Sequence, residues 1–268
     1  MLRDFAIWLF SYDKPGKMPA FGFFHILYAV LIFGTVIGLG FLFSKKSEKF
    51  KNNVLNVIAG SILFLYLADF FIQPLMHGDT AVEGTMDIDK LPFHICTVMC
   101  PLIILFHQFK KLSFAKEAFA FLAMVGSLMY ITFPGSAIGE DTSPICYDIL
   151  QTFLYHALVF AWGYYMIALG KVKPSIKRCW QPILGLCCLA VWATFGRLIY
   201  AAGDSTYDWM FLVKASGIFG DPKPYTFLLT LGSISAVMLA LYGVYYAVIG
   251  VMKLIEKNKT KKTPAKVK

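Results

Sequence analysis

Seven apolar stretches, separated by short polar connections, dominate the chain. Several of them exceed the roughly 20 residues that an α-helix needs to cross the hydrocarbon core of a bilayer. They cover residues 21–43, 54–76, 91–109, 117–134, 147–170, 181–202 and 226–252. The pattern therefore predicts an all-α fold: a polytopic membrane protein built as a seven-transmembrane-helix bundle.

The same pattern divides the chain into three parts. The transmembrane domain covers residues 21–252, and residues 1–20 precede it as an interfacial segment. Within that segment, the stretch 2–10 is amphipathic but too short to span, so we expect it to lie in the membrane interface. Residues 253–268 form a basic tail with seven lysines, which should be disordered or lie along anionic headgroups.

Composition supports a membrane protein and argues against other classes. Apolar residues make up 58% and charged residues only 15% of the chain, whereas soluble domains are nearer a quarter charged. The net charge of +9 comes from basic residues between and after the spans, where they set topology, so no nucleic-acid partner is expected. The six cysteines show no spacing typical of a zinc module or disulfide scaffold. We therefore expect no metal and no cofactor, with membrane lipids as partners and a homo-oligomer left open.

Basic residues are distributed unequally between the two sides of the membrane. Alternate connections and termini carry 6 Lys and Arg on one side and 18 on the other. Because positive residues favour the cytoplasmic side, the amino terminus is expected outside and the carboxyl terminus in the cytoplasm. The expected location is the cell membrane as a multi-pass protein, in a bacterium the cytoplasmic membrane.

Five of the titratable side chains within the spans are expected at similar depth, each on a different helix. They are His25, Asp69, His94, His156 and Arg197. With the orientation above, all five fall in the outer half of the membrane. An ionisable group in hydrocarbon costs at least a few kcal/mol and usually faces the bundle interior. Their similar depth predicts one polar chamber in the outer half.

The fifth span carries a polar stripe that sharpens this prediction. Gln151, Thr152, Tyr155 and His156 follow Asp148 at spacings of three, four, seven and eight residues. These spacings place the five residues on one face of a helix. A stripe of this kind would be very unfavourable against lipid, so we expect it to face other helices or a wet cavity.

Candidate chemistry concentrates in the segment from Leu91 to Cys100. His94 is suited to act as a base, a ligand or a hydrogen-bond donor, and Cys96 as a nucleophile if a base makes it a thiolate. Positions two apart on a regular helix are about 200° apart, so His94 and Cys96 should not share a face. Purely structural roles stay open for some of these residues. Asp69 and Arg197 could form a buried ion pair that only fixes helix packing, and His25 could be a packing residue.

The order of features resembles the YwaF-like bacterial integral membrane family, a distant relative of the eukaryotic transmembrane-protein-164 type. The matching segments are FGFFHILY (Phe21 to Tyr28), YLADF around Asp69, LPFHIC (Leu91 to Cys96), Pro134, FLYH (Phe153 to His156), YDWMFL (Tyr207 to Leu212) and PKPY (Pro222 to Tyr225). The resemblance implies a seven-helix bundle with a polar centre at His94 and His156, and cysteine-dependent acyl transfer on phospholipids. In the eukaryotic relatives the cysteine directly precedes the histidine, a position that Phe93 holds here.

These observations favour a lipid acyltransferase or lipid esterase with its site in the outer half. His156 would act as base or acid, His94 as its partner or the oxyanion donor, and Cys96 or a water as nucleophile. Arg197 would hold a phosphate or carboxylate, and Asp69 would orient a histidine or balance Arg197. The alternatives are a carrier or binding protein for a small anionic or zwitterionic solute, and a structural membrane subunit without catalysis.

The basic asymmetry predicts the location of the carboxyl terminus. A reporter that is active only in the cytoplasm, fused after Lys268, should be active. If the fusion is well expressed but silent, the carboxyl terminus lies outside. The orientation is then the reverse of the one predicted, and the polar chamber belongs in the inner half.

Overall fold

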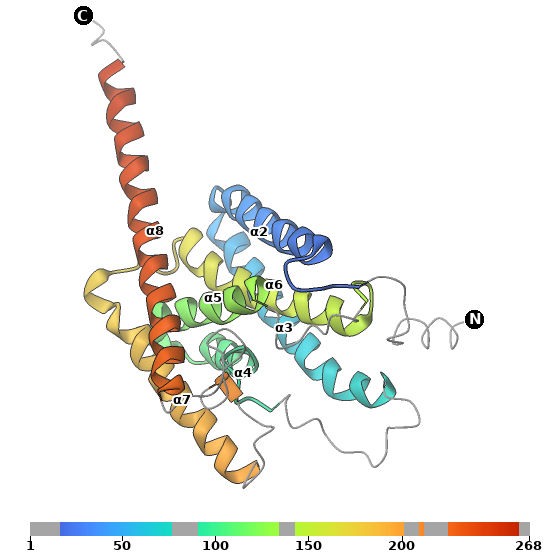
Figure 1. Ribbon diagram of the computed structural model, residues 1–268. Helices are drawn as coiled ribbons and strands as arrows, with labels where there is room; N and C mark the ends of the chain where they lie inside the picture. The colour runs from blue at the N-terminus through green and yellow to red at the C-terminus, as the bar shows by residue number, and fades with distance from the viewer. Residues whose placement is uncertain (1–16, 77–90, 134–142, 201–208, 212–224, 263–268) are drawn as a thin grey trace, which may run out of the picture.

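The computed structural model describes residues 17–76, 91–133, 143–200, 209–211 and 225–262, and in these ranges it contains seven α-helices and no strand (Figure 1). The α-helices are α2 (Phe23–Ser44), α3 (Glu48–Met76), α4 (Ile95–Gln108), α5 (Lys116–Thr132), α6 (Tyr147–Ala168), α7 (Trp180–Tyr200) and α8 (Thr226–Lys262). Three short 3-10 helices accompany them: η4 (Lys110–Ala115), η5 (Ile176–Arg178) and η6 (Trp209–Phe211).

Each described α-helix coincides with one apolar stretch of the sequence. Five stretches are long and apolar enough to cross a membrane: Phe23–Ser44, Glu48–Asp69, Leu112–Thr132, Ile176–Ile199 and Thr226–Ile255. The multi-pass, all-helical prediction is thereby confirmed, while the count of seven spans and the orientation stay predictions. The expected interfacial segment 2–10 lies outside the described residues. The basic tail is helical through Lys262, as a continuation of α8.

The pair α5 and α6 forms the centre of the bundle. α6 also packs against α2 and α3, while α5 packs against α4, α7 and α8. A Cβ added at Gly163 of α6 would lie 2.5 Å from the carbonyl oxygen of Ala120 on α5, so the missing side chain lets the two backbones approach closely. Trp162 and Phe121 are fully buried in the surrounding core.

The basic connections meet at one end of the bundle, which we call the basic end. Lys171, after α6, forms an ion pair of 2.7 Å with Glu48 at the start of α3. Arg178, before α7, forms another of 2.7 Å with Glu117 at the start of α5. At the opposite end, His25 near the start of α2 bonds to the carbonyl of Ile131 near the end of α5. These contacts place the starts of α3, α5 and α7 and the end of α6 at the basic end, and the start of α2 and the end of α5 at the opposite end.

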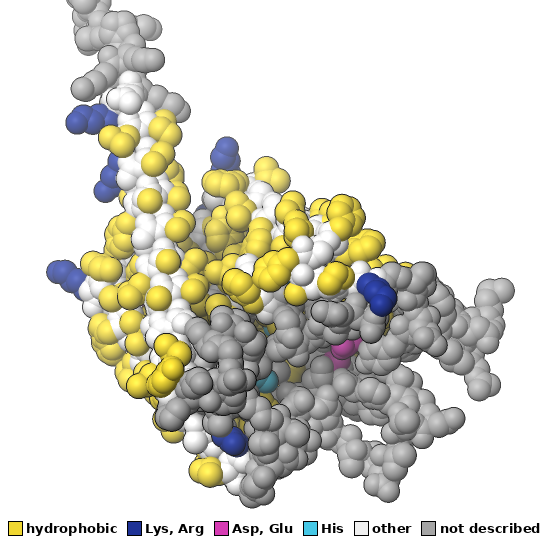
Figure 2. Space-filling view, in the orientation of Figure 1, with side chains coloured by type: hydrophobic (Ala, Val, Ile, Leu, Met, Phe, Trp, Pro, Cys, Tyr) yellow, Lys and Arg dark blue, Asp and Glu magenta, His cyan; other side chains and the backbone are white. Residues whose placement is uncertain are grey.

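Outer surfaces of the peripheral helices are apolar. In α2, only 11% of the residues in its most apolar 18-residue stretch are buried. In the stretch Leu112–Thr132, which contains α5, the corresponding share is 61%. Figure 2 shows apolar side chains over the outer faces of α2 and α8. Exposed phenylalanine, leucine and valine side chains on both helices suit contact with lipid tails.

Replacing Gly163 by alanine should destabilise the bundle, because the new methyl group would collide with the α5 backbone at Ala120. We expect a loss of about 1–3 kcal/mol, typical of overpacking, measured as a lower thermal unfolding temperature of the purified protein in detergent. Gly60→Ala on α3 is the control, because no atom lies within 4 Å of its added Cβ. Equal stability of the Gly163 variant and this control would contradict the close α5–α6 packing.

Candidate functional site

His156 lies near the middle of α6, and its side chain is buried. Its Nδ1 is 2.7 Å from the carbonyl oxygen of Thr152, one helical turn earlier. Because a carbonyl can only accept, Nδ1 carries the proton of this hydrogen bond, and Nε2 holds the lone pair of the neutral imidazole. The local helix therefore fixes both the orientation and the tautomer of His156.

Tyr130 of α5 stacks on His156 and was not foreseen from the sequence. The two ring centroids are 3.8 Å apart and the planes differ by 9°. The Tyr130 hydroxyl is buried, and Thr152 and Cys96 lie near it. A single tyrosine in an apolar span shows no helical stripe, so only its position near the carboxyl-terminal end of the expected fourth span could have indicated it.

Other residues of the α6 stripe contact α3 and α4. The Tyr155 hydroxyl donates to the backbone oxygen of Cys96 at 3.0 Å. Gln151 reaches the carbonyl oxygen of Leu65 at 3.5 Å, and Thr152 donates to the Gln151 side chain at 3.2 Å. The stripe is thus a bridge between neighbouring helices, and its side chains face the bundle interior.

Asp69 of α3 is buried next to this stripe and lies within electrostatic range of Tyr155. We call the combined group the polar cluster. It comprises Asp69 of α3, Cys96 of α4, Tyr130 of α5, and Gln151, Thr152, Tyr155 and His156 of α6. Four helices therefore contribute to one polar region of the core.

His94 is the residue that precedes the first turn of α4, with extended backbone angles of φ −76° and ψ 151°. The helical-face argument therefore does not separate its side chain from that of Cys96, because His94 is not inside the helix. The backbone N–H of Met210 in η6 donates to His94 Nδ1 at 3.2 Å. An N–H can only donate, so Nδ1 accepts, and in the neutral imidazole the proton is on Nε2.

Cys96 is partly exposed and forms no disulfide among the described residues, and it lies one turn before the buried Cys100. Both Tyr130 and Tyr155 lie within electrostatic range of Cys96. In the described ranges, no hydrogen bond or ring contact joins His94 to His156. The structure thus brings Cys96 to the polar cluster and directs His94 toward η6.

Arg197 stands apart from the polar cluster. It is partly exposed near the end of α7, which packs against α5 and α8, whereas α3 packs against α4 and α6. No ion pair within 4 Å joins Arg197 to Asp69 in the described part of the chain. The direct Asp69–Arg197 pair that the sequence suggested is therefore not formed among these residues.

Two further histidines have packing roles. His25 accepts from the backbone N–H of Phe21 through Nδ1 at 2.9 Å and donates through Nε2 to Ile131 at 2.8 Å. His107 accepts from the indole N–H of Trp162 at 2.9 Å. Within the described residues, no group of three or more His, Cys, Asp and Glu side chains could hold a metal ion.

Comparison with known proteins places the chain in a family. No curated protein and no solved structure matches it. The family model described as the TMEM164 family matches residues 20–247, which includes every helix that contributes to the polar cluster. The fold, with its apolar spans and buried polar core, and this match over most of the chain lead to one conclusion: the protein is a multi-pass membrane protein that belongs to the TMEM164 family.

Proposed function

We propose that this protein is a membrane enzyme that transfers or hydrolyses acyl groups of a phospholipid or related lipid. The main support is the polar cluster: a partly exposed thiol, two phenols and an imidazole of fixed tautomer meet inside an apolar bundle. The substrate of such a site would be embedded in the bilayer, where its ester bond lies at the depth of the headgroup boundary.

The tautomers of the two histidines support different roles for them. His156 Nε2 carries a lone pair, while the Thr152 carbonyl holds the opposite nitrogen, so His156 is suited to accept a proton as a general base. His94 Nε2 carries the proton because Nδ1 accepts from Met210, so His94 is suited to donate a hydrogen bond to a developing oxyanion. The Tyr130 hydroxyl, buried near Cys96, would be a second donor.

The proposed reaction has two steps. In the first, the Cys96 thiol loses its proton to His156, and the sulfur attacks the ester carbonyl. The C–O bond of the ester breaks, the lysolipid alkoxide takes the proton back from His156, and a thioester remains on Cys96. In the second, His156 takes a proton from an acceptor alcohol or water, whose oxygen attacks the thioester and releases the Cys96 sulfur, which regains the proton. An alcohol gives acyl transfer, and water gives hydrolysis.

Substrate contacts would come from the remaining polar residues. Arg197 makes no hydrogen bond or ion pair with any described residue, so its guanidinium is available for a phosphate or carboxylate. Gln151, Thr152 and Tyr155 would line the region around the acyl ester. Asp69 would orient the hydroxyl groups of Tyr66 and Tyr155, which lie within its electrostatic range. A structural role alone would account for the hydrogen bonds of Gln151 and Tyr155.

Labelling of Cys96 tests the proposal directly. A lipid-mimetic chloroacetamide should form a thioether adduct on Cys96 of the purified protein, located by peptide mass spectrometry. His156→Gln should slow this labelling by about tenfold or more, because the thiol loses its base. Cys100, which is buried, should remain unlabelled under the same conditions.

His107→Gln is the matched control. It also removes an imidazole from the bundle, but the new amide oxygen can still accept from Trp162. Its labelling rate should stay within about twofold of the unmodified protein. Absence of an adduct on Cys96, or equal rates in the two variants, would rule out covalent catalysis through this pair.

A further inference from the structure

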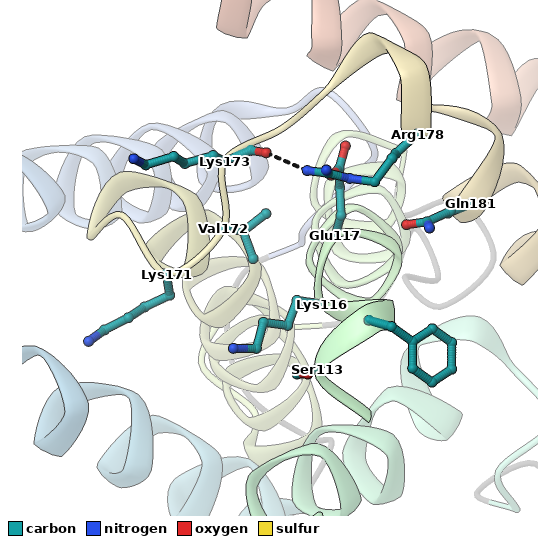
Figure 3. A pocket seen from close by; sticks show the side chains of 9 residues that line it. Ser113, Lys116, Glu117, Lys171, Val172, Lys173, Arg178 and Gln181 are labelled. Carbon is teal, nitrogen blue, oxygen red and sulfur yellow. Dashed lines mark hydrogen bonds and ion pairs between the residues drawn. The ribbon is translucent and has the colours of Figure 1, made fainter. Parts of the chain in front are cut away.

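A second polar site lies at the basic end, apart from the polar cluster. A pocket of about 400 Å³ opens between the start of α5, the α6–α7 connection and the start of α7 (Figure 3). Its charged and polar lining includes Lys116, Glu117, Lys171, Lys173, Arg178 and Gln181. Fifteen residues separate His156 from Lys171, which places the pocket about 20 Å along α6 from the polar cluster.

Glu117 is the structural hub of this pocket. Its carboxylate is buried and accepts from the Ser175 backbone N–H at 2.8 Å, the Arg178 Nε at 2.7 Å and the Tyr242 hydroxyl at 2.6 Å. Arg178 also donates to the carbonyl oxygen of Lys173 at 2.9 Å. Glu117 therefore uses its negative charge to hold the wall of the pocket in place.

Positive charge in the pocket exceeds what the local carboxylates neutralise. Arg178 is paired with Glu117, and Lys171 is paired with Glu48. Lys116 and Lys173 have no carboxylate partner among the described residues. Figure 3 shows the ammonium ends of Lys116, Lys171 and Lys173 on one side of the pocket, away from Gln181.

Gln181 adds a directional group to the opposite wall. Its side-chain oxygen is buried and has no hydrogen-bond partner among the described residues. A buried polar atom of this kind normally has a partner, so a ligand hydroxyl or amine in the pocket would satisfy it. The pocket thus combines two unneutralised ammonium groups with one buried acceptor.

We propose that this pocket binds a phosphate ester that carries a hydroxyl group, such as the headgroup of an anionic phospholipid. The phosphate is held by Lys116 and Lys173, with Lys171 beside them, and the hydroxyl donates to Gln181. Ammonium groups at the membrane surface attract anionic lipid headgroups and bind phosphate as point charges. A soluble phosphate ester has the same recognition chemistry and is the other source of the ligand.

Lipid binding to the full-length protein tests this site. Native mass spectrometry of the purified protein in detergent, titrated with phosphatidylglycerol, gives the apparent affinity, and diacylglycerol is the phosphate-free comparison. The double variant K116Q/K173Q should bind phosphatidylglycerol at least about tenfold more weakly. The double variant K45Q/K46Q removes the same charge from the exposed α2–α3 connection and should stay within about twofold.

The outcomes separate the site from its alternatives. Equal affinity of the unmodified protein for phosphatidylglycerol and diacylglycerol, or equal losses in the two double variants, would overturn the proposal. Displacement of the lipid by millimolar glycerol 3-phosphate supports a soluble phosphate ester as ligand, and retention supports the lipid headgroup. If K116Q/K173Q unfolds at a lower temperature than K45Q/K46Q, the variants are not compared. The proposal is then judged by whether the unmodified protein binds phosphatidylglycerol more tightly than diacylglycerol. None of these results depends on Cys96 labelling, so the site can stand or fall independently of the proposed catalysis.

Discussion

The close approach of α5 and α6 at Gly163 is the contact on which the arrangement of the bundle depends. It places α6 at the centre of the bundle, where α2, α3 and α5 pack around it. A helix in that position can carry several polar side chains, because none of them must face lipid. The same stripe on a peripheral helix such as α2 would be exposed to hydrocarbon. The position of α6 therefore makes the polar cluster possible.

Polar groups inside the bundle fall into two groups by what they bond to. His25 and His107 use their ring nitrogens on fixed donors and acceptors of the bundle, so they stabilise helix contacts. His156 uses one nitrogen on its own helix, through Thr152, and its ring stacks on Tyr130 of α5. This difference distinguishes histidines that hold the bundle together from one that is positioned within it.

Hydropathy in the sequence predicted the helices well, because each span must bury its backbone bonds in one continuous apolar segment. The α6 stripe also followed from spacing alone, since Gln151, Tyr155 and His156 lie on one helical face. Contacts between helices could not be predicted in this way. Stacking of Tyr130 on His156 depends on how α5 and α6 are rotated about their axes, which one sequence does not specify. The separation of Arg197 from Asp69 depends on which helices are neighbours.

The start of α4 shows a second reason for the difference between sequence and structure. The 200° argument treats His94 as a helical residue, but Pro92 and the extended backbone at His94 delay the helix until Ile95. Glu117 illustrates a third: at the start of a span it looks like an ordinary interfacial charge. Its three hydrogen bonds arise only when the α6–α7 connection and α8 pack over it.

The length of α8 has a mechanical consequence. Its hydroxyls at Tyr242 and Tyr246 are fastened to Glu117 and to the backbone of Pro174 and Ile176, and the helix then continues for sixteen residues to Lys262 (Figure 1). That continuation is a rod of about 24 Å with five lysines. The attachment nearest the rod is Tyr246, which bonds to Pro174 and Ile176, so a force on the rod would act first on the α6–α7 connection and then, through Tyr242, on Glu117.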